Sequence, residues 1–285
     1  MAQGKIGVQL STIKDKLKEL GVYETMRHLS HIGYHSVEVS QIPTDRASLT
    51  ELKRACTDFS IEVSAMSAHL EPMPGIGSES LTTDFDKIVD DCKFLNCKFL
   101  RIGIIPFNLI DSKDLVIEFA RKCDAVAAKL AEHGIDLYYH NHHIEFMKMD
   151  GEYVLDIIKH QAKRMGFELD VHWIQRGGEE PLKIIKHYEG RVKLLHLKDF
   201  RIAKLDASPL ATGDVPGFMQ NFLGLIEFAE VGEGSLDFKA IIDTGLQCGA
   251  QYFFVEQDST YGRDPFESLK ISAENLKKLG YADWF

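Results

Sequence analysis

Histidine, lysine and acidic residues gather at the ends of short apolar runs, where their side chains could hold a metal ion or move a proton. The residues are His69, His140 and His142, Asp170 and His172, His196 and Lys198, and Glu256 and Asp258. Residues two apart share one face of a β-strand, because strand side chains alternate. Imidazole nitrogens and carboxylate oxygens are ligands for divalent metals. The runs therefore predict a metal site wherever the fold brings these strand ends together.

The apolar runs alternate with longer amphipathic stretches, which is the pattern of a parallel sheet with helical crossovers. The predicted strands are residues 6–10, 35–40, 61–69, 98–105, 136–141, 167–172, 192–197 and 252–257. The predicted helices are residues 24–31, 49–59, 85–95, 114–133, 153–164, 181–188, 236–247 and 265–279. Even spacing, and the lack of a GxGxxG motif after the first strand, favour a closed (β/α)8 TIM barrel over an open doubly wound sheet.

The whole chain, residues 1–285, is therefore predicted to be a single barrel domain, with its active site at the carboxyl ends of the strands. One long segment, residues 200–231, has no clear period and is punctuated by Gly and Pro. Loops of this length are usually functional, so we expect this one to form a lid over the barrel mouth.

Composition and charge exclude several classes of protein. The chain has 43 acidic and 33 basic residues and a formal charge of −10, which argues against a nucleic-acid partner. No stretch reaches 18 apolar residues and the N-terminus does not resemble a signal peptide, so we expect no membrane association and a cytoplasmic location. The five cysteines form no CxxC pair and are expected to be buried thiols.

The alternation within LLHLKD predicts which side chains enter the barrel. Leu195 and Leu197 suit the helix-packed face, which leaves His196 and Lys198 facing inward. A lone histidine at a strand end, such as His69, is more often structural than catalytic. Asp170, His196 and Glu256 form a stronger set, since a shared cation would keep buried carboxylates charged.

Five motifs, taken in order and spacing, resemble one known family. They are YHNHHIEF, ELDVHWIQRGG, GRVKLLHLKDF, VGEGSLDF and FVEQD. Together they resemble the sugar phosphate isomerase/epimerase superfamily, also called xylose-isomerase-like TIM barrels, which includes the type-2 AP endonucleases. The resemblance spans nearly the whole chain.

The resemblance implies one divalent metal ion, Mn, Co, Mg or Zn, held by residues after strands five to eight. Asp170, His196 and Glu256 match the last three ligand positions. Many family members carry Glu at the strand-five position, where this chain has His140, so His140 is the expected fourth ligand and His142 the alternative.

The same resemblance implies chemistry through an enediolate of a sugar. The metal would polarise a carbonyl, and Glu256, or His142 if it is not a ligand, would move the proton. Lys198 would donate to an oxyanion, or else pair with Asp199 as a structural residue. His140 in place of a carboxylate weakens the two-carboxylate epimerase design, and Glu145 is either a substitute or a solvated loop residue.

Four further residues are expected substrate contacts: His69, Glu38, Trp173 and Asp258. Glu38 has an alternative role as an ion-pair partner of Arg101. VGEG (231–234) is explained as well by a tight turn as by a phosphate site, so a free sugar or keto-sugar is the expected substrate.

The first functional hypothesis is thus a metal-dependent sugar isomerase or epimerase. A lyase or dehydratase that uses the same enolate is the alternative, and a non-catalytic sugar-binding barrel stays open because fold alone does not define activity. A nuclease is disfavoured by the acidic charge and the small number of ligands. The aromatic C-terminus, LGYADWF, is expected to dock on its own domain, with contact to a second subunit of a homo-oligomer as the alternative.

Overall fold

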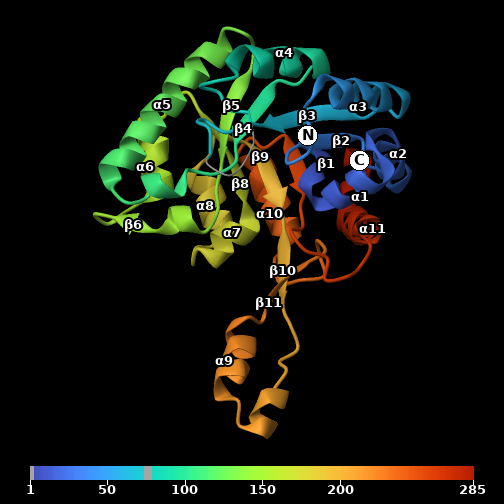
Figure 1. Cartoon of the computed structure of the whole chain (residues 1–285), viewed down its shortest axis with the longest axis vertical. Coiled ribbons are helices and arrows are strands. Elements are labelled where there is room, and N and C mark those ends of the chain that lie inside the picture. The colour runs from blue at the N-terminus through green and yellow to red at the C-terminus, as the bar shows by residue number, and fades with distance from the viewer. Residues whose placement is uncertain (1–2, 74–78) are drawn as a thin grey trace.

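The computed structural model describes residues 3–73 and 79–285 and contains a closed eight-stranded parallel barrel surrounded by helices (Figure 1). The barrel strands are β1 (Lys5–Gln9), β2 (Ser36–Val39), β3 (Glu62–Ser67), β4 (Phe99–Ile102), β5 (Asp136–His140), β8 (Gly166–Asp170), β9 (Val192–Leu197) and β12 (Tyr252–Val255). Around the barrel each strand pairs with its neighbours in chain order, and β12 closes on β1. The predicted TIM barrel is therefore confirmed.

Helices follow the barrel strands and cover the outside of the barrel (Figure 1). The α-helices outside the segment 199–229 are α1 (Lys14–Leu20), α2 (Val22–Ile32), α3 (Arg46–Asp58), α4 (Phe85–Leu95), α5 (Lys113–Ala131), α6 (Val154–Gln161), α7 (Val171–Arg176), α8 (Pro181–His187), α10 (Phe238–Gln247) and α11 (Pro265–Leu276). Local signals set their ends: Asp45 caps the start of α3, and Gly33 ends α2 in the left-handed conformation.

Several short elements complete the chain. The 3-10 helices are η1 (Leu10–Ile13), η2 (Phe107–Leu109), η3 (Ile144–Phe146), η4 (Ser208–Thr212) and η6 (Ala282–Trp284), with a π-helical turn η5 (Lys277–Tyr281) and a small hairpin of β6 (Lys148–Met149) and β7 (Glu152–Tyr153). Trp284 packs on Phe253 and Tyr281 with ring centroids 5.5 and 4.7 Å away, so the C-terminus docks on its own barrel. None of the described helices is long and apolar enough to cross a lipid bilayer.

The barrel interior has an apolar floor, separate from the larger core between strands and helices. The floor is formed by Ala65, Tyr138, Leu194 and Phe254. Leu195 and Leu197 belong to the outer core, as the alternation in LLHLKD predicts. Three of the four floor residues stand two positions before His140, His196 or Glu256, so these polar side chains lie above an apolar layer on the same inner face.

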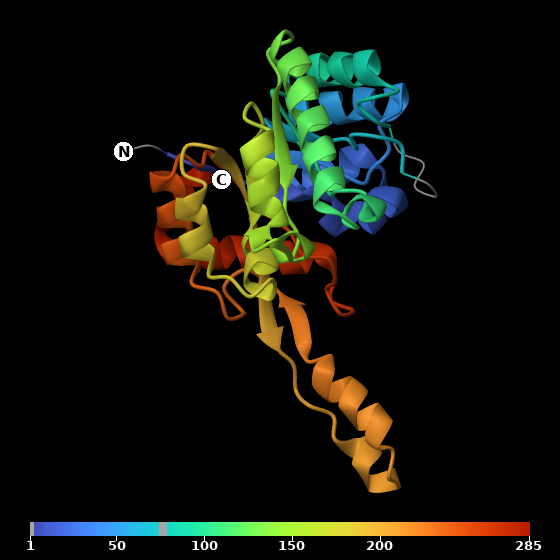
Figure 2. The same ribbon diagram turned by 90° about the vertical axis from the view of Figure 1, so that its left-hand side faces the viewer.

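The segment between β9 and α10 is an ordered arm, where the sequence predicted an irregular lid over the barrel mouth. Strands β10 (Asp199–Ile202) and β11 (Ile226–Ala229) pair antiparallel and carry η4 and helix α9 (Val215–Leu223) at their outer end. Figures 1 and 2 show this arm projecting away from the barrel body. Pro209 and Pro216 in the first turns of η4 and α9 favour these short helices, which explains the missing period.

The pairing of β5 with β8 depends on a glycine. Gly166 stands opposite Tyr138, and a Cβ at position 166 would collide with the Tyr138 ring. We predict that Gly166→Ala lowers the free energy of unfolding by about 1–3 kcal/mol in urea titrations, because the ring must leave its packed position. In a Tyr138→Ala background the same substitution should cost much less. Equal costs in both backgrounds would contradict this account of the register.

Candidate metal centre

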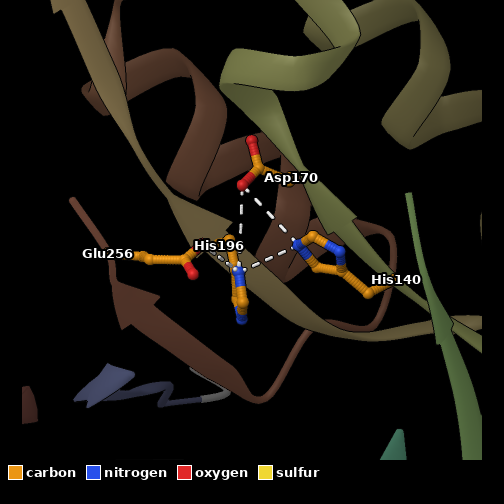
Figure 3. Close-up of side chains that lie close together, drawn as sticks. All are labelled: His140, Asp170, His196 and Glu256. Atoms are coloured by element: carbon orange, nitrogen blue, oxygen red, sulfur yellow. Dashed lines mark hydrogen bonds and ion pairs between the residues drawn. The ribbon is translucent and has the colours of Figure 1, made fainter. Parts of the chain in front are cut away.

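Four buried side chains converge at the carboxyl ends of four neighbouring strands (Figure 3). His140, Asp170, His196 and Glu256 each offer one ligand atom, and these atoms all lie within 4.8 Å of one another. His140 Nε2 lies 3.1 Å from His196 Nδ1, and His196 Nδ1 lies 2.8 Å from Glu256 Oε2. Asp170 Oδ2 lies 3.7 Å from His140 Nε2 and 3.8 Å from His196 Nδ1. The cluster contains His140 and not His142.

Strand register brings the four groups together. Asp170 pairs with His196 across β8 and β9, and His196 pairs with Phe254 across β9 and β12. The side-chain oxygen of Asn141 accepts a hydrogen bond from the backbone N–H of Asp170 at 3.0 Å, which ties the end of β5 to the end of β8. Each functional side chain is therefore placed by sheet hydrogen bonds rather than by a mobile loop.

The imidazole orientations suit a metal ion. His140 Nδ1 lies 3.3 Å from the Gly103 carbonyl and donates to it, which leaves the Nε2 lone pair facing the cluster. Burial, followed by the nearby His196, holds the pKa of His140 well below its usual range, so this ring is neutral, as a ligand must be.

The carboxylates of the cluster also suit a divalent metal ion. Asp170 Oδ2 is buried and has no hydrogen-bond partner among the described residues, although it faces two imidazoles and forms a longer ion-pair contact of 3.4 Å with Lys198 Nζ. A buried carboxylate oxygen without a hydrogen bond is costly, and a bound cation would satisfy it. Two nitrogen and two oxygen ligands fit a borderline divalent ion such as Zn, Co or Mn better than Mg. The residues present therefore fit the ion that the sequence predicts.

His196 is held from its other side by a buried ion-pair network. Its Nε2 lies 3.3 Å from both Glu38 Oε2 and Glu168 Oε2. Arg101 Nε lies 2.6 Å from Glu38 Oε1 and 3.0 Å from Glu168 Oε2. A histidine ligand whose second nitrogen donates to a carboxylate is fixed in tautomer and orientation. The network thus aims His196 Nδ1 at the cluster.

Glu38 is accordingly a structural partner in this arrangement. It is fully buried, and its ion pair with Arg101 is the alternative role that the sequence suggested. Burial alone would raise the pKa of Glu38, but Arg101 and then His196 hold it below its usual value. For Glu168, burial and then the charge of Glu38 raise the pKa to about 8. The pair therefore shares one charge at neutral pH.

Lys198 enters the site from just beyond β9. Its Nζ lies 2.8 Å from Glu256 Oε2, 3.4 Å from Asp170 Oδ2 and 3.1 Å from both carboxylate oxygens of Asp258. Burial would lower the pKa of Lys198, but Glu256 and then Asp170 and Asp258 raise it above its usual value. Lys198 is therefore a fixed positive charge beside the candidate ligands, and Asp258 holds it there.

Lys198 does not pair with Asp199, which was one of the two roles that the sequence left open for it. Asp199 Oδ2 accepts hydrogen bonds from the backbone N–H groups of Gly232 and Gly234, and its Oδ1 accepts from Ser235 and Leu236. Asp199 is the first residue of β10, and these four backbone donors engage both of its carboxylate oxygens. It fastens the base of the arm to the segment before α10.

Several predicted residues form a wall beside the cluster. The Trp173 ring lies 5.2 Å from Lys198 Nζ and 5.5 Å from the His142 ring. Four aromatic or imidazole side chains there have buried ring nitrogens without a hydrogen-bond partner: His69 Nδ1, His142 Nδ1, Trp173 Nε1, and both nitrogens of His172. Unpartnered ring nitrogens at one mouth suit a ligand rich in hydroxyl groups.

Two expectations about strand ends need correction. His172 does not share a strand face with Asp170, because β8 ends at Asp170 and α7 begins at Val171. The chain turns there because Asp170 Oδ1 accepts a hydrogen bond from the backbone N–H of Trp173 and caps the helix. His142 likewise lies beyond the last residue of β5, so the spacing of two did not set its direction.

Glu145 is not solvated, contrary to one of the two expectations for it. It is fully buried, and it accepts hydrogen bonds from the Tyr139 hydroxyl at 2.7 Å and from the backbone N–H of His142 at 2.8 Å. Burial raises its pKa to about 7. These bonds fold the loop that presents His142, so Glu145 acts on the site through this loop.

Sequence reasoning missed Glu168 and Gln9. Glu168 stands two residues before Asp170, so strand alternation alone places it on the inner face. Gln9, the last residue of β1, donates its side-chain N–H to Glu256 Oε1 at 2.8 Å. The contact of Gln9 with Glu256 could have been expected because Gln9 is a polar residue at the carboxyl end of the first strand.

The buried ion pairs give a stability prediction. We expect Arg101→Met to lower the free energy of unfolding by about 3–5 kcal/mol, because Glu38 would keep a buried charge with no cationic partner from β4. Urea denaturation checks this. The exposed ion pair of Arg164 with Asp124 supplies the control, and Arg164→Met should change stability by less than about 1 kcal/mol. Equal losses in the two variants would refute the role of Arg101.

Glu145 gives a prediction about pH. Its pKa of about 7 in the folded protein is above its unfolded value, so the folded state binds more protons between these two values. Stability from this group therefore falls as pH rises toward 7, by at most about 1.4 kcal/mol per pH unit. The stability advantage of the wild type over Glu145→Gln should shrink over this window and stay level above it. A pH-independent difference in urea titrations would show that Glu145 does not titrate there.

Comparison with curated proteins finds a partial match. The chain is 28% identical over 170 residues to the rhizopine catabolism protein MocC of Rhizobium meliloti. The match covers 59% of this chain and 50% of MocC, so the chain spans about half the length of this relative.

Solved structures resemble the chain over nearly its whole length. A sugar phosphate isomerase/epimerase from Parabacteroides distasonis has a TM-score of 0.74 and 21% identity, with 98% of this chain and 95% of that chain covered. The 3-keto-D-glucoside 4-epimerase of E. coli has a TM-score of 0.63 and 15% identity, with 97% and 99% covered. At these identities the likeness is one of fold.

The family model described as xylose isomerase-like TIM barrel matches residues 26–279, which include every barrel strand except β1. All four residues of the candidate metal centre fall within this match. The chain therefore belongs to the xylose isomerase-like TIM barrel family.

Proposed function

We propose that this protein is a metal-dependent isomerase or epimerase that acts through an enediolate on a free sugar or keto-sugar. The observation that carries the proposal is the convergence of His140, Asp170, His196 and Glu256 within 4.8 Å at the barrel mouth. These four residues would hold one divalent ion, Mn, Co, Zn or Mg. When bound, the ion would polarise a substrate carbonyl and stabilise negative charge that develops on its oxygen.

Lys198 supplies a second positive charge for the same oxygen. Its ammonium group is buried beside Glu256 and Asp170 and is anchored by Asp258. A charge that is already fixed and desolvated stabilises a developing oxyanion without reorganisation during the reaction. Asp258 therefore acts as a positioning residue, rather than as the direct substrate contact that we expected from the sequence.

His142 is better suited than Glu256 to move the proton. Glu256 Oε1 accepts from Gln9, and its Oε2 faces Lys198 and His196 as a candidate metal ligand, so neither oxygen is free to take a proton. Burial, then His140, lowers the pKa of His142 to about 2, so this ring is neutral at pH 7, and its advantage over Glu256 is its free position rather than its basicity. Its buried Nδ1 has no partner and is free to take a proton from carbon.

A substrate without phosphate fits the rest of the site. The backbone N–H groups of Gly232 and Gly234, in the VGEG segment, already donate to Asp199 and cannot cradle a phosphate. The neutral polar nitrogens of His69 and Trp173 instead suit hydroxyl groups. The name of the E. coli structure, a 3-keto-D-glucoside 4-epimerase, agrees with such a substrate, whereas that of the Parabacteroides structure refers to a sugar phosphate; both names belong to those proteins.

Metal content and proton exchange test the proposal together. We expect about one divalent ion per chain by elemental analysis, and its loss in the Asp170→Asn/His196→Gln double variant. The wild type should exchange a carbon-bound proton of a keto-sugar with D2O, followed by NMR across a panel of free sugars. His160→Gln, which changes an exposed histidine paired with Glu152, is the matched control and should retain both properties.

The variants separate ligands from catalytic residues. His142→Gln and Lys198→Met should keep the ion and lower exchange by roughly 100-fold or more, since general base catalysis and oxyanion stabilisation each contribute about this much. Exchange accompanied by loss of water would identify a lyase on the same scaffold. A protein that takes up no ion from Mn, Co or Zn would contradict the mechanism and favour a sugar-binding barrel.

A further inference from the structure

The arm formed by residues 199–229 carries the largest group of exposed apolar side chains in the described structure. Residues 201–228 include no buried residue. Seven of the eleven large hydrophobic side chains that are exposed in the described residues lie on the arm: Ile202, Leu210, Val215, Met219, Phe222, Leu223 and Ile226. So many exposed large apolar side chains on one short segment are unusual on a monomer and point to an interaction site.

The composition of the arm is that of an interface core. Residues 207–226 contain a single charged residue, Asp214, in a chain that is 27% charged overall. Phe218, Met219 and Phe222 lie within one helix of nine residues. Depletion of charge together with enrichment in Phe and Met distinguishes the centre of protein–protein interfaces from the remaining surface.

Helix α9 lacks the packing that normally stabilises a helix of its length. None of its nine residues is buried, and Phe218 and Phe222 stack mainly on each other, with ring centroids 6.2 Å apart. Isolated helices shorter than about 12–15 residues are marginal in water, and tertiary packing supplies most helix stability in proteins. The helix therefore requires a surface against which its apolar side chains can pack.

The barrel mouth of the same chain offers such a surface. Three of the four other exposed large hydrophobic residues, Phe107, Met147 and Tyr261, lie on segments that follow barrel strands β4, β5 and β12. We call these three residues the rim. Tyr261 accepts a hydrogen bond from the backbone N–H of Phe228 at 3.0 Å, so the rim adjoins the base of the arm. Figures 1 and 2 show that the outer arm points away from its own barrel, and the three rim side chains are exposed in the chain by itself.

We infer that the arm docks on a second copy of this chain, with α9 of each protomer seated against the rim of its partner. One chain thus carries both the apolar projection and the apolar seat, which is what a closed two-fold exchange of arms requires. Each chain bears a formal charge of −10, so two copies repel through most of their surface and approach best through this nearly uncharged segment.

The size of the surface suits a stable dimer. Burying a side chain of this kind removes on the order of 100 Å² from water, so the seven partly exposed ones on an arm still offer roughly 400 Å². Two reciprocal arms, with the surfaces that they cover, would bury on the order of 1,600 Å², which is the size of a standard stable interface. In this arrangement the partner's arm also borders the mouth through which a sugar enters.

The oligomeric state tests the inference. Analytical ultracentrifugation of the full chain should show a dimer at micromolar concentration. The Phe222→Lys/Leu223→Lys variant, which changes only exposed side chains, should raise the dissociation constant at least ~100-fold, because buried lysines at two central contacts are strongly unfavourable. Leu20→Lys, an exposed apolar position outside the arm and rim, is the matched control and should leave the dimer intact. A monomeric wild type, or a dimer that tolerates the arm variant, would overturn the inference.

Cross-linking tests the seat on the rim. In a Cys56→Ser background, in which the four remaining native cysteines are buried, Leu223→Cys and Phe107→Cys proteins are mixed and treated with a short bis-maleimide. We expect cross-linked dimers that join one variant to the other. Efficient cross-linking of Leu223→Cys to itself, with none to Phe107→Cys, would show that two arms pair with each other and would refute the seat. Circular dichroism and metal content confirm that each variant is folded.

Discussion

Four carboxylates buried inside one end of the barrel set the constraint on which the rest of the site depends. Glu38, Glu168 and Asp170 are completely buried and Glu256 is 5% exposed. Carboxylates leave water only when protonated or compensated by positive charge, so the surrounding strands must supply protons or cations. The charges fall into two layers, both above the apolar floor. Arg101 serves Glu38 in one, and Lys198 with a divalent ion would serve Asp170 and Glu256 in the other. His196 joins the layers because its two nitrogens face different carboxylates.

Single strands contribute residues to both layers, one residue to the ion-pair network and another to the candidate metal centre. On β8, Glu168 belongs to the ion-pair network and Asp170, two residues later, to the candidate metal centre. On β9, Leu194 forms part of the apolar floor and His196 is a candidate ligand. Just beyond β9, the side chain of Lys198 is held in place by Asp170, Glu256 and Asp258. Alternation with period two thus produces layers, and each step toward the carboxyl end becomes more polar. The candidate metal centre therefore lies at the carboxyl ends of the strands, and the ion-pair network and the apolar floor lie beneath it.

The barrel and the inward direction of Asp170 and His196 could be predicted from the sequence because they follow from alternation, whereas His140 was assigned as the fourth ligand through the family resemblance. LLHLKD distinguishes Leu195 from His196 without any tertiary information, and Asp170 and Glu256 close similar runs. The prediction became unreliable beyond the last strand residue, where cap geometry takes over: Asp170 begins a helix, and this turns His172 away from the strand direction. The partners of Lys198 and Glu38 were open for a related reason. These partners lie on segments distant in sequence, so strand register decides which of them comes within reach. It brings Asp258 rather than Asp199 to Lys198, and it brings Arg101 to Glu38. The arm could not be predicted because its short helices have prolines in their first turns and pack on no core, so its sequence has no hydrophobic period.

Histidine at the strand-five position gives the candidate centre a charge that matches a divalent ion. His140 is neutral, so the four groups carry two negative charges, from Asp170 and Glu256, once His196 binds as a neutral ring. A glutamate in place of His140 would add a third negative charge and leave one uncompensated. Of the remaining charges, Lys198 balances Asp258 in number while it also contacts Glu256 and Asp170, and Arg101 pairs with Glu38. Glu168 keeps its proton at neutral pH because its pKa is about 8. Around His196, the carboxylates of Glu168, Glu256 and Glu38 outweigh burial and raise the pKa well above its usual value, so occupation of Nδ1 by a metal ion would release a proton. Metal affinity would then depend on pH through His196. The strand-five histidine removes a carboxylate base from this position, and in the proposed mechanism His142 would take that role.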